Sequence, residues 1–138
     1  MEASARKELV EWINHTIEVN LSKIEDTASG AIACLLLDMI HPGIGKVPVN
    51  KINWAAKEPH EFIANYKILA TCFAHLQIDK FIDVNRLIQS RAKDNFEFMA
   101  WFRSYFDTYF QYDQSYSPVV QRLKGKGTLL NCKILLIT

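Results

Sequence analysis

The residue types that most often perform catalysis or hold a metal ion are few and scattered in this sequence. Four histidines and three cysteines are present: His15, Cys34, His41, His60, Cys72, His75 and Cys132. No two histidines have the His-x-x-x-His or His-Glu-x-x-His spacing that places two metal ligands on one helix face. Cys72 and His75 could share a helix face, but two ligands do not complete a zinc site. We therefore expect packing and surface roles for these side chains, and no bound metal.

The cysteines also exclude two other kinds of site. Their odd number and wide spacing allow neither a disulfide framework nor a Cys-x-x-Cys redox or zinc motif. We expect reduced and mostly buried thiols.

Two glycine-lysine segments could suggest phosphate binding, but neither has the required pattern. Gly45-Lys46 lacks the upstream glycine and the following hydroxyl residue of a phosphate-binding loop, and the segment 124–128 lacks the spacing. The sequence therefore predicts a protein that is not an enzyme and uses no cofactor.

Basic residues are the remaining chemical signal, because they are distributed unevenly. The net charge is +1, yet residues 1–40 hold 3 basic and 7 acidic residues, whereas residues 41–93 hold 8 basic and 4 acidic residues. A local excess of positive charge on a nearly neutral protein attracts an acidic partner surface. By itself such an excess is as often an ordinary solvated face, which contributes little to stability.

Hydrophobic periodicity predicts helices that would position these residues. Leu9, Trp12, Ile13, Thr16 and Ile17 form the stripe of an amphipathic helix of about four turns. Residues 29–40 are apolar on nearly every side, which indicates a central buried helix that Pro42 and Gly43 end.

Residues 41–59 contain three prolines and two glycines and no sustained period, which is typical of a long structured loop. We expect Trp54 to anchor this loop to the body of the domain.

Two further long helices are expected beyond the loop. Pro59 suits the first turn of a helix with a core-facing seam, predicted to be the longest: Phe62, Tyr66, Leu69, Phe73 and Leu76. Residues 77–93 suggest a connector with one short helix. Asp94 or Asn95 could cap the last helix, whose wide aromatic face we expect to be core: Phe98, Trp101, Phe102, Tyr105, Phe106 and Tyr109. Nothing in this pattern requires a sheet.

Three blocks of the sequence carry a specific resemblance. They are EWINHTIEVNLSKIED, then SGAIACLLLDMIHPG, then the run from His60 to Asp107 that includes Lys93-Asp94-Asn95-Phe96-Glu97-Phe98. In this order they resemble the end-binding family of microtubule plus-end tracking proteins over nearly all of residues 6–112. The resemblance implies an all-α calponin-homology fold with about four main helices and short connecting helices, over residues 1–118. Residues 119–138 would be a C-terminal extension whose structure is uncertain.

The resemblance also implies a function and a partner. Family members dock between protofilaments, prefer the nucleotide state of tubulin near growing ends and regulate microtubule dynamics. Carried over position by position, the implied contact residues are Arg6, Lys51, Lys57, Lys80, Arg91 and Lys93. We expect them to converge on one face of the folded domain.

The sequence departs from the family pattern at several of these positions. The loop between Pro42 and Lys51 is longer by about two residues, and Asn50 occupies a position where lysine is common. Gln89 and Ser104 likewise replace frequent lysines, and Lys93 occupies a position usually filled by glutamine. These changes put the local geometry and individual charge contacts in question.

Partners and location follow from the same expectation. We expect tubulin as the partner and no binding of nucleic acid. We also expect no membrane association, because no segment has the roughly 20 uninterrupted apolar residues that span a bilayer. The N-terminus resembles no secretion signal, so the expected location is cytoplasmic, on microtubule ends and the spindle. The chain has no dimerising coiled coil, so a monomer is expected. A calponin-homology protein-interaction or actin-binding module is the alternative, since fold does not fix function.

Overall fold

The structure, a computed structural model, describes residues 3–127, in which helices are joined by loops. Four long helices are α1 (Ala3–Ile17), α2 (Ala31–Ile40), α3 (Pro59–Leu76) and α5 (Ala92–Tyr109). Shorter ones are the 3-10 helices η1 (Ile24–Ser29) and η2 (Val49–Lys51) and the α-helices α4 (Val84–Leu87) and α6 (Pro118–Leu123). The described residues contain no strand, only one isolated bridge between Asn53 and Lys126. The predicted all-α architecture of four main helices is confirmed.

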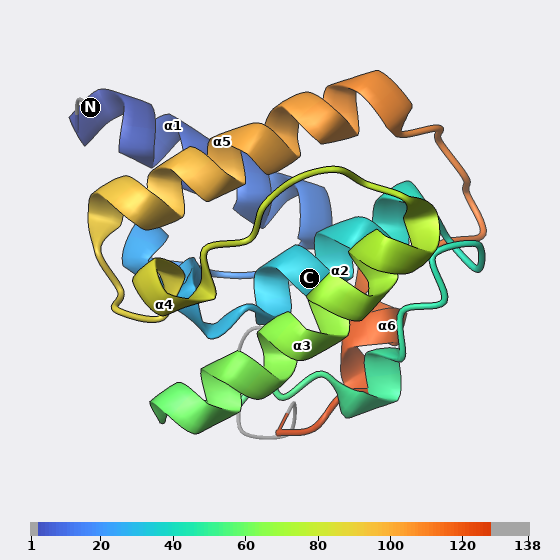
Figure 1. Cartoon of the computed structure of the whole chain (residues 1–138). Helices are drawn as coiled ribbons and strands as arrows, with labels where there is room; N and C mark the ends of the chain where they lie inside the picture. Colours follow the sequence, from blue (N-terminus) through green and yellow to red (C-terminus); the bar gives the residue numbers. More distant parts are fainter. Residues whose placement is uncertain (1–2, 128–138) are drawn as a thin grey trace.

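Helix α2 lies at the centre of the molecule, surrounded by the other long helices (Figure 1). Nine of its ten residues are buried, as its uniformly apolar sequence predicted. Gly30 precedes it in the left-handed conformation, and a Cβ there would lie 3.1 Å from Cβ of Asn65 and 3.2 Å from the Tyr66 ring. Glycine at this position therefore permits the close approach of α2 to α3.

The start of α3 is fixed by hydrogen bonds that connect it to the preceding loop. Glu58 and Glu61 form a reciprocal capping box around Pro59. One turn later the buried Asn65 donates to the carbonyls of Ser29, at 2.9 Å, and Asn53, at 3.1 Å. Its side-chain oxygen accepts from the Asn53 N–H at 3.0 Å. One amide thus joins η1, the loop and α3.

Two details of the predicted helices are wrong. Helix α5 begins at Ala92 after Arg91, so neither Asp94 nor Asn95 is the N-cap. Asn95 is buried and instead donates to the Leu87 carbonyl at 3.1 Å, because the short α4 packs there. Helix α3 is also not the longest, since α3 and α5 each have 18 residues.

The aromatic face of α5 lies mostly in the core, as predicted. Phe98 and Phe102 are buried and their rings meet edge to face with centroids 5.4 Å apart. Tyr109, at the end of the helix, is exposed. Cys34 and Cys72 are buried free thiols, in agreement with the prediction, and Cys132 lies outside the described residues.

The residues after α5 return to pack against α2 and η2. Tyr116 Oη and Gln121 Nε2 donate to the Asp38 carboxylate of α2, at 2.7 and 3.0 Å. Further along, Lys126 exchanges backbone hydrogen bonds with Ile52 and Trp54, each of 2.8 Å. The Arg122 guanidinium lies 5.9 Å from the centre of the Trp54 ring, so Trp54 anchors its loop as expected. The boundary at residue 118 stays a prediction.

Candidate functional site

Three of the four long helices begin on the same side of the molecule. In Figure 1 the first turns of α1, α3 and α5 all lie at the left. Each helix start carries a partial positive charge from its unpaired N–H groups. This side is therefore electropositive before any side chain is counted.

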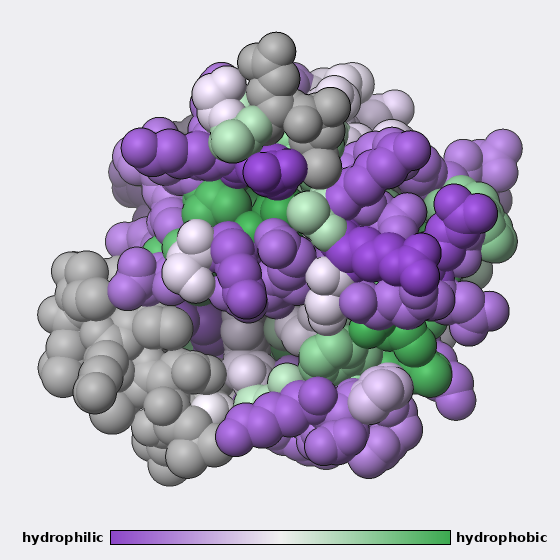
Figure 2. All heavy atoms as spheres, turned by 90° about the vertical axis from the view of Figure 1, so that its left-hand side faces the viewer, coloured by the Kyte–Doolittle hydropathy of each residue, from purple (hydrophilic) through white to green (hydrophobic). Residues whose placement is uncertain are grey.

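Four of the six predicted contact residues lie at these helix starts. Arg6 is in the first turn of α1, Lys57 precedes α3 by two residues, and Arg91 and Lys93 begin α5. We call this set the cationic side. Figure 2, which faces it, shows hydrophilic residues over most of the visible surface with hydrophobic patches between them. The fold thus gathers positive groups that are far apart in sequence.

The charges of the cationic side are not neutralised within the domain. The described residues contain two side-chain ion pairs, Arg86 with Asp83 at 3.6 Å and Arg103 with Glu8 at 3.7 Å. Neither pair includes a predicted contact residue. Arg6 also borders a groove of about 350 Å³ between α1 and residues 21–25, together with Lys7 and Lys23 and with the acidic Glu11 and Glu25. The groove therefore carries both signs of charge.

Glu61, beside Lys57, is one of several acidic residues on this side, with Glu58 before α3 and Asp94 in the first turn of α5. Backbone N–H groups of Lys57 and Glu58 donate to its carboxylate at 3.0 and 2.9 Å, and these bonds lower the pKa of Glu61. Its carboxylate thus fixes the backbone on which Lys57 is presented.

The remaining two predicted residues lie elsewhere. Lys80 is half-buried in the connector, with its ammonium 5.8 Å from the centre of the Trp101 ring. Lys51 is exposed on η2, which packs against α6 away from the start of α5 (Figure 1). The structure therefore places four of the six residues on one side and separates Lys51 from them.

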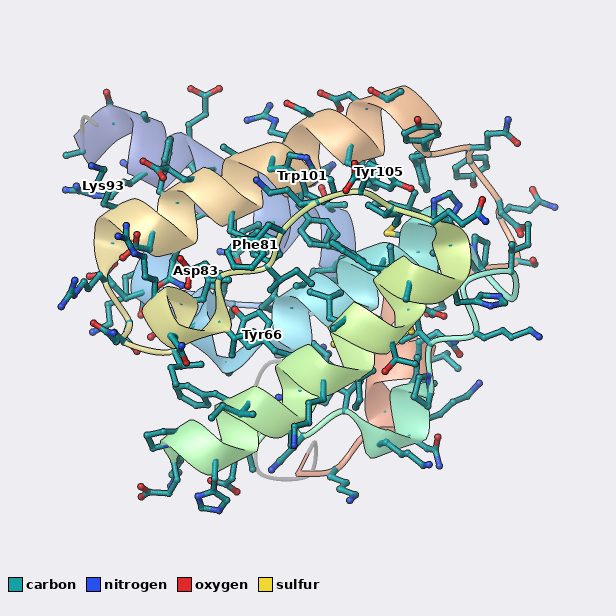
Figure 3. All side chains as sticks on the ribbon, in the orientation of Figure 1. Tyr66, Phe81, Asp83, Lys93, Trp101 and Tyr105 are labelled. Carbon is teal, nitrogen blue, oxygen red and sulfur yellow. The ribbon has the colours of Figure 1, made fainter. Side chains whose placement is uncertain are left out.

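One exposed side chain near the cationic side was missed by the sequence analysis. Phe81 lies in the connector predicted over residues 77–93, and its side chain is 78% exposed. Figure 3 shows Phe81 below Trp101 and next to Asp83, with Lys93 farther away at the start of α5. A connector that runs extended alternates its faces, so two neighbours cannot both point inward. This alternation is the sequence signal that could have identified Phe81 as exposed.

No catalytic or metal site is evident in residues 3–127. This range contains no group of three or more His, Cys, Asp or Glu side chains that could hold a metal ion. Burial raises the pKa of the Cys34 thiol strongly, which disfavours the reactive thiolate. Over the same range no helix is both long and apolar enough to cross a membrane.

Comparison with known proteins identifies the family to which this fold belongs. A family model described as the calponin homology (CH) domain matches residues 3–111. "Microtubule-associated protein RP/EB family member 1C" of Arabidopsis thaliana is 43% identical over 122 residues, covering 88% of this chain and 36% of the relative. Member 1B of the same species is 42% identical, covering 87% of this chain and 41% of the relative. The chain thus spans less than half the length of these relatives.

A solved structure gives the same result in three dimensions. It comes from work titled "Structural Basis of Microtubule Plus End Tracking by XMAP215, CLIP-170 and EB1". The two folds superpose with a TM-score of 0.80 and 34% identity, covering 86% of this chain and 98% of that one. The chain belongs to the calponin homology family and is, as its sequence motifs predicted, the calponin homology domain of an end-binding family protein.

Proposed function

We propose that this domain binds the microtubule lattice near growing ends and regulates microtubule dynamics. The supporting observation is the 40–43% identity to relatives named microtubule-associated, over 122 residues of this chain. The proposed location is the cytoplasm, on the microtubule cytoskeleton and the spindle.

The cationic side supplies the attraction in this proposal. Lys57, Arg91 and Lys93 are exposed and Arg6 is half-buried, and none of the four has an ion pair among the described residues, so they are available to an acidic partner. An exposed charge contact contributes about 0.2–1 kcal/mol and is screened by salt. Affinity then requires several contacts acting together and falls as ionic strength rises.

Lys51 and Lys80 have different roles in the same proposal. Lys51, on η2, would contact a second tubulin subunit, since its distance from the helix starts suits a partner that spans more than one surface. Lys80 holds its ammonium over the Trp101 ring, 5.8 Å from its centre, as a cation–π contact. Substituting Lys80 by methionine would therefore remove the charge and this contact while keeping an unbranched side chain.

Preference for growing ends follows from shape and not from charge. The acidic surface of tubulin runs along the whole lattice, so charge alone cannot distinguish its regions. A rigid domain that touches several subunits makes all its contacts only when their spacing is right. We expect tighter binding to a GTP-like lattice than to a GDP lattice, and equal binding to both would remove this part of the proposal.

Sedimentation with microtubules tests the cationic side directly. Lys57→Glu and Arg91→Glu should each weaken binding about tenfold, because reversal replaces an attraction by a repulsion. Lys46→Glu is the matched control, since Lys46 is exposed in the loop after α2, away from the helix starts. Loss with Lys46→Glu equal to that of the other two would argue against this surface. Parallel pelleting with actin filaments tests the alternative function.

A further inference from the structure

The connector between α3 and α4 alternates strictly between an inner and an outer face. Ile78, Lys80 and Ile82 are half-buried, whereas Gln77, Asp79 and Phe81 are exposed. Polar side chains are the ordinary occupants of an outer face. Phe81 is the apolar exception, with 78% of its side chain exposed.

Phe81 stands beside the cationic side. It lines a recess of about 150 Å³ with Lys80, Asp83, Arg86, Asp94 and residues of the core. Asp94 immediately follows Lys93, so this recess lies against the first turn of α5. In Figure 3 Phe81 lies next to Asp83 and below Trp101, with Lys93 farther away at the start of α5.

The charges around Phe81 nearly cancel. Lys80 and Arg86 are opposed by Asp83, Asp94 and Glu97, and Arg86 is already paired with Asp83 at 3.6 Å. Long-range attraction therefore comes from the helix starts around this recess and not from the recess itself. A neutral centre with an exposed aromatic and a charged rim is the usual anatomy of a protein-binding surface.

The other large exposed apolar side chains of the described residues lie elsewhere. Ile44, Tyr109 and Tyr112 border the far end of α5, and Val120 and Leu123 are on α6. Phe81 is thus the one such side chain, within residues 3–127, that adjoins the cationic side.

From these observations we infer that Phe81 is the apolar anchor of the lattice-binding surface and inserts into an apolar recess of tubulin that acidic residues surround. This inference rests on the proposed function. Lys80, on the inner face, supports the connector against Trp101, while its neighbour Phe81 makes the contact. Burying an exposed aromatic ring removes a large apolar area from water, so a single such residue can dominate the affinity.

Microtubule sedimentation at several salt concentrations tests the inference. Phe81→Ser should weaken binding about tenfold or more, whereas Phe81→Ile, which retains an apolar side chain, should weaken it about threefold or less. The dependence of affinity on salt should be unchanged in both variants, because no charge is altered. Arg91→Glu, in contrast, should change that dependence.

Tyr112→Ser is the matched control, because Tyr112 is 82% exposed at the opposite end of α5 and should not affect binding. Thermal unfolding of each variant checks the fold, which an exposed position should leave unchanged. If Phe81→Ser binds like the unaltered chain while Arg91→Glu loses affinity, the anchor is refuted and the proposed function stands. If the unaltered chain does not pellet with microtubules, the proposed function fails and the anchor fails with it.

Discussion

The two ends of helix α5 have contrasting surroundings. At its start, Arg91 and Lys93 are exposed and lie on the same side as Lys57 and the half-buried Arg6 from other helix starts. At its far end, His41 and Tyr105 share a hydrogen bond of 2.7 Å, and the rings of Tyr105 and Tyr109 lie 4.5 Å apart. The basic side chains of the first end have no ion pair among the described residues, whereas His41 and Tyr105 at the second end are partners of each other.

The far end has its own electrostatic character. A recess of about 730 Å³ there is lined by residues that include His41, Tyr109, Tyr112 and Asp113. Burial lowers the pKa of His41, while burial and the neighbouring Tyr109 raise the pKa of Tyr105. Both shifts favour neutral side chains. Asp113 lines the same recess, and hydrogen bonds from Ser115 lower its pKa, so this end holds a carboxylate beside the neutral His41 and Tyr105. The comparison therefore teaches that one helix can gather basic side chains at one end and keep a histidine and a tyrosine neutral at the other.

The largest effect is expected from a substitution in the buried helix α2, which supports both ends of α5. Leu35 is fully buried in α2, so Leu35→Ala should lower the free energy of unfolding by about 3 kcal/mol through lost burial and a new cavity. The midpoint of thermal unfolding should fall by roughly 10 °C. Val120→Ala, at an exposed position on α6, is the control and should change it little. A small effect of Leu35→Ala would mean that the two ends are stabilised independently of α2.

A smaller effect should distinguish the two ends. Tyr105→Phe removes the hydroxyl that bonds His41 and should lower the free energy of unfolding by about 1 kcal/mol. Microtubule affinity should not change, because this residue is remote from the cationic side. Tyr112→Phe, at an exposed tyrosine, should alter neither quantity. A loss of affinity in Tyr105→Phe would show that the two ends are coupled.

The smallest effect is a dependence of stability on pH. Because burial lowers the pKa of His41 below its usual value of about 6.5, the folded state binds fewer protons than the unfolded chain between the two values. The contribution of neutral His41 is present above about pH 6.5 and is lost as the pH falls through the folded pKa. Asp113 and the hydroxyl groups of Tyr105 and Tyr109 face the same region.

Thermal unfolding at about pH 7.5 and about pH 5.5 measures this dependence. The difference between the two midpoints should be smaller for His41→Gln, which keeps a polar side chain but does not titrate. An equal difference in both proteins would assign the pH dependence to other groups.

The sequence by itself determined the four long helices and most of the core, because these follow from local periodicity, whereas α6 was not predicted. The uniformly apolar residues of α2 predicted a buried helix, and Pro59 marked the start of α3. The start of α5 was misplaced because Asn95 has the type of a capping residue, while its side chain is needed to bond Leu87 of a neighbouring segment. Only the packed structure decides between such competing partners.

The arrangement of the proposed binding surface was decided by tertiary structure alone. Arg6, Lys57 and Arg91 are separated by tens of residues, and they share a side only because three long helices pack with their starts together. The same packing turned Lys80 inward onto Trp101 and Phe81 outward. Periodicity fixes which residues of one helix share a face, but the directions of separate helices depend on how their cores fit.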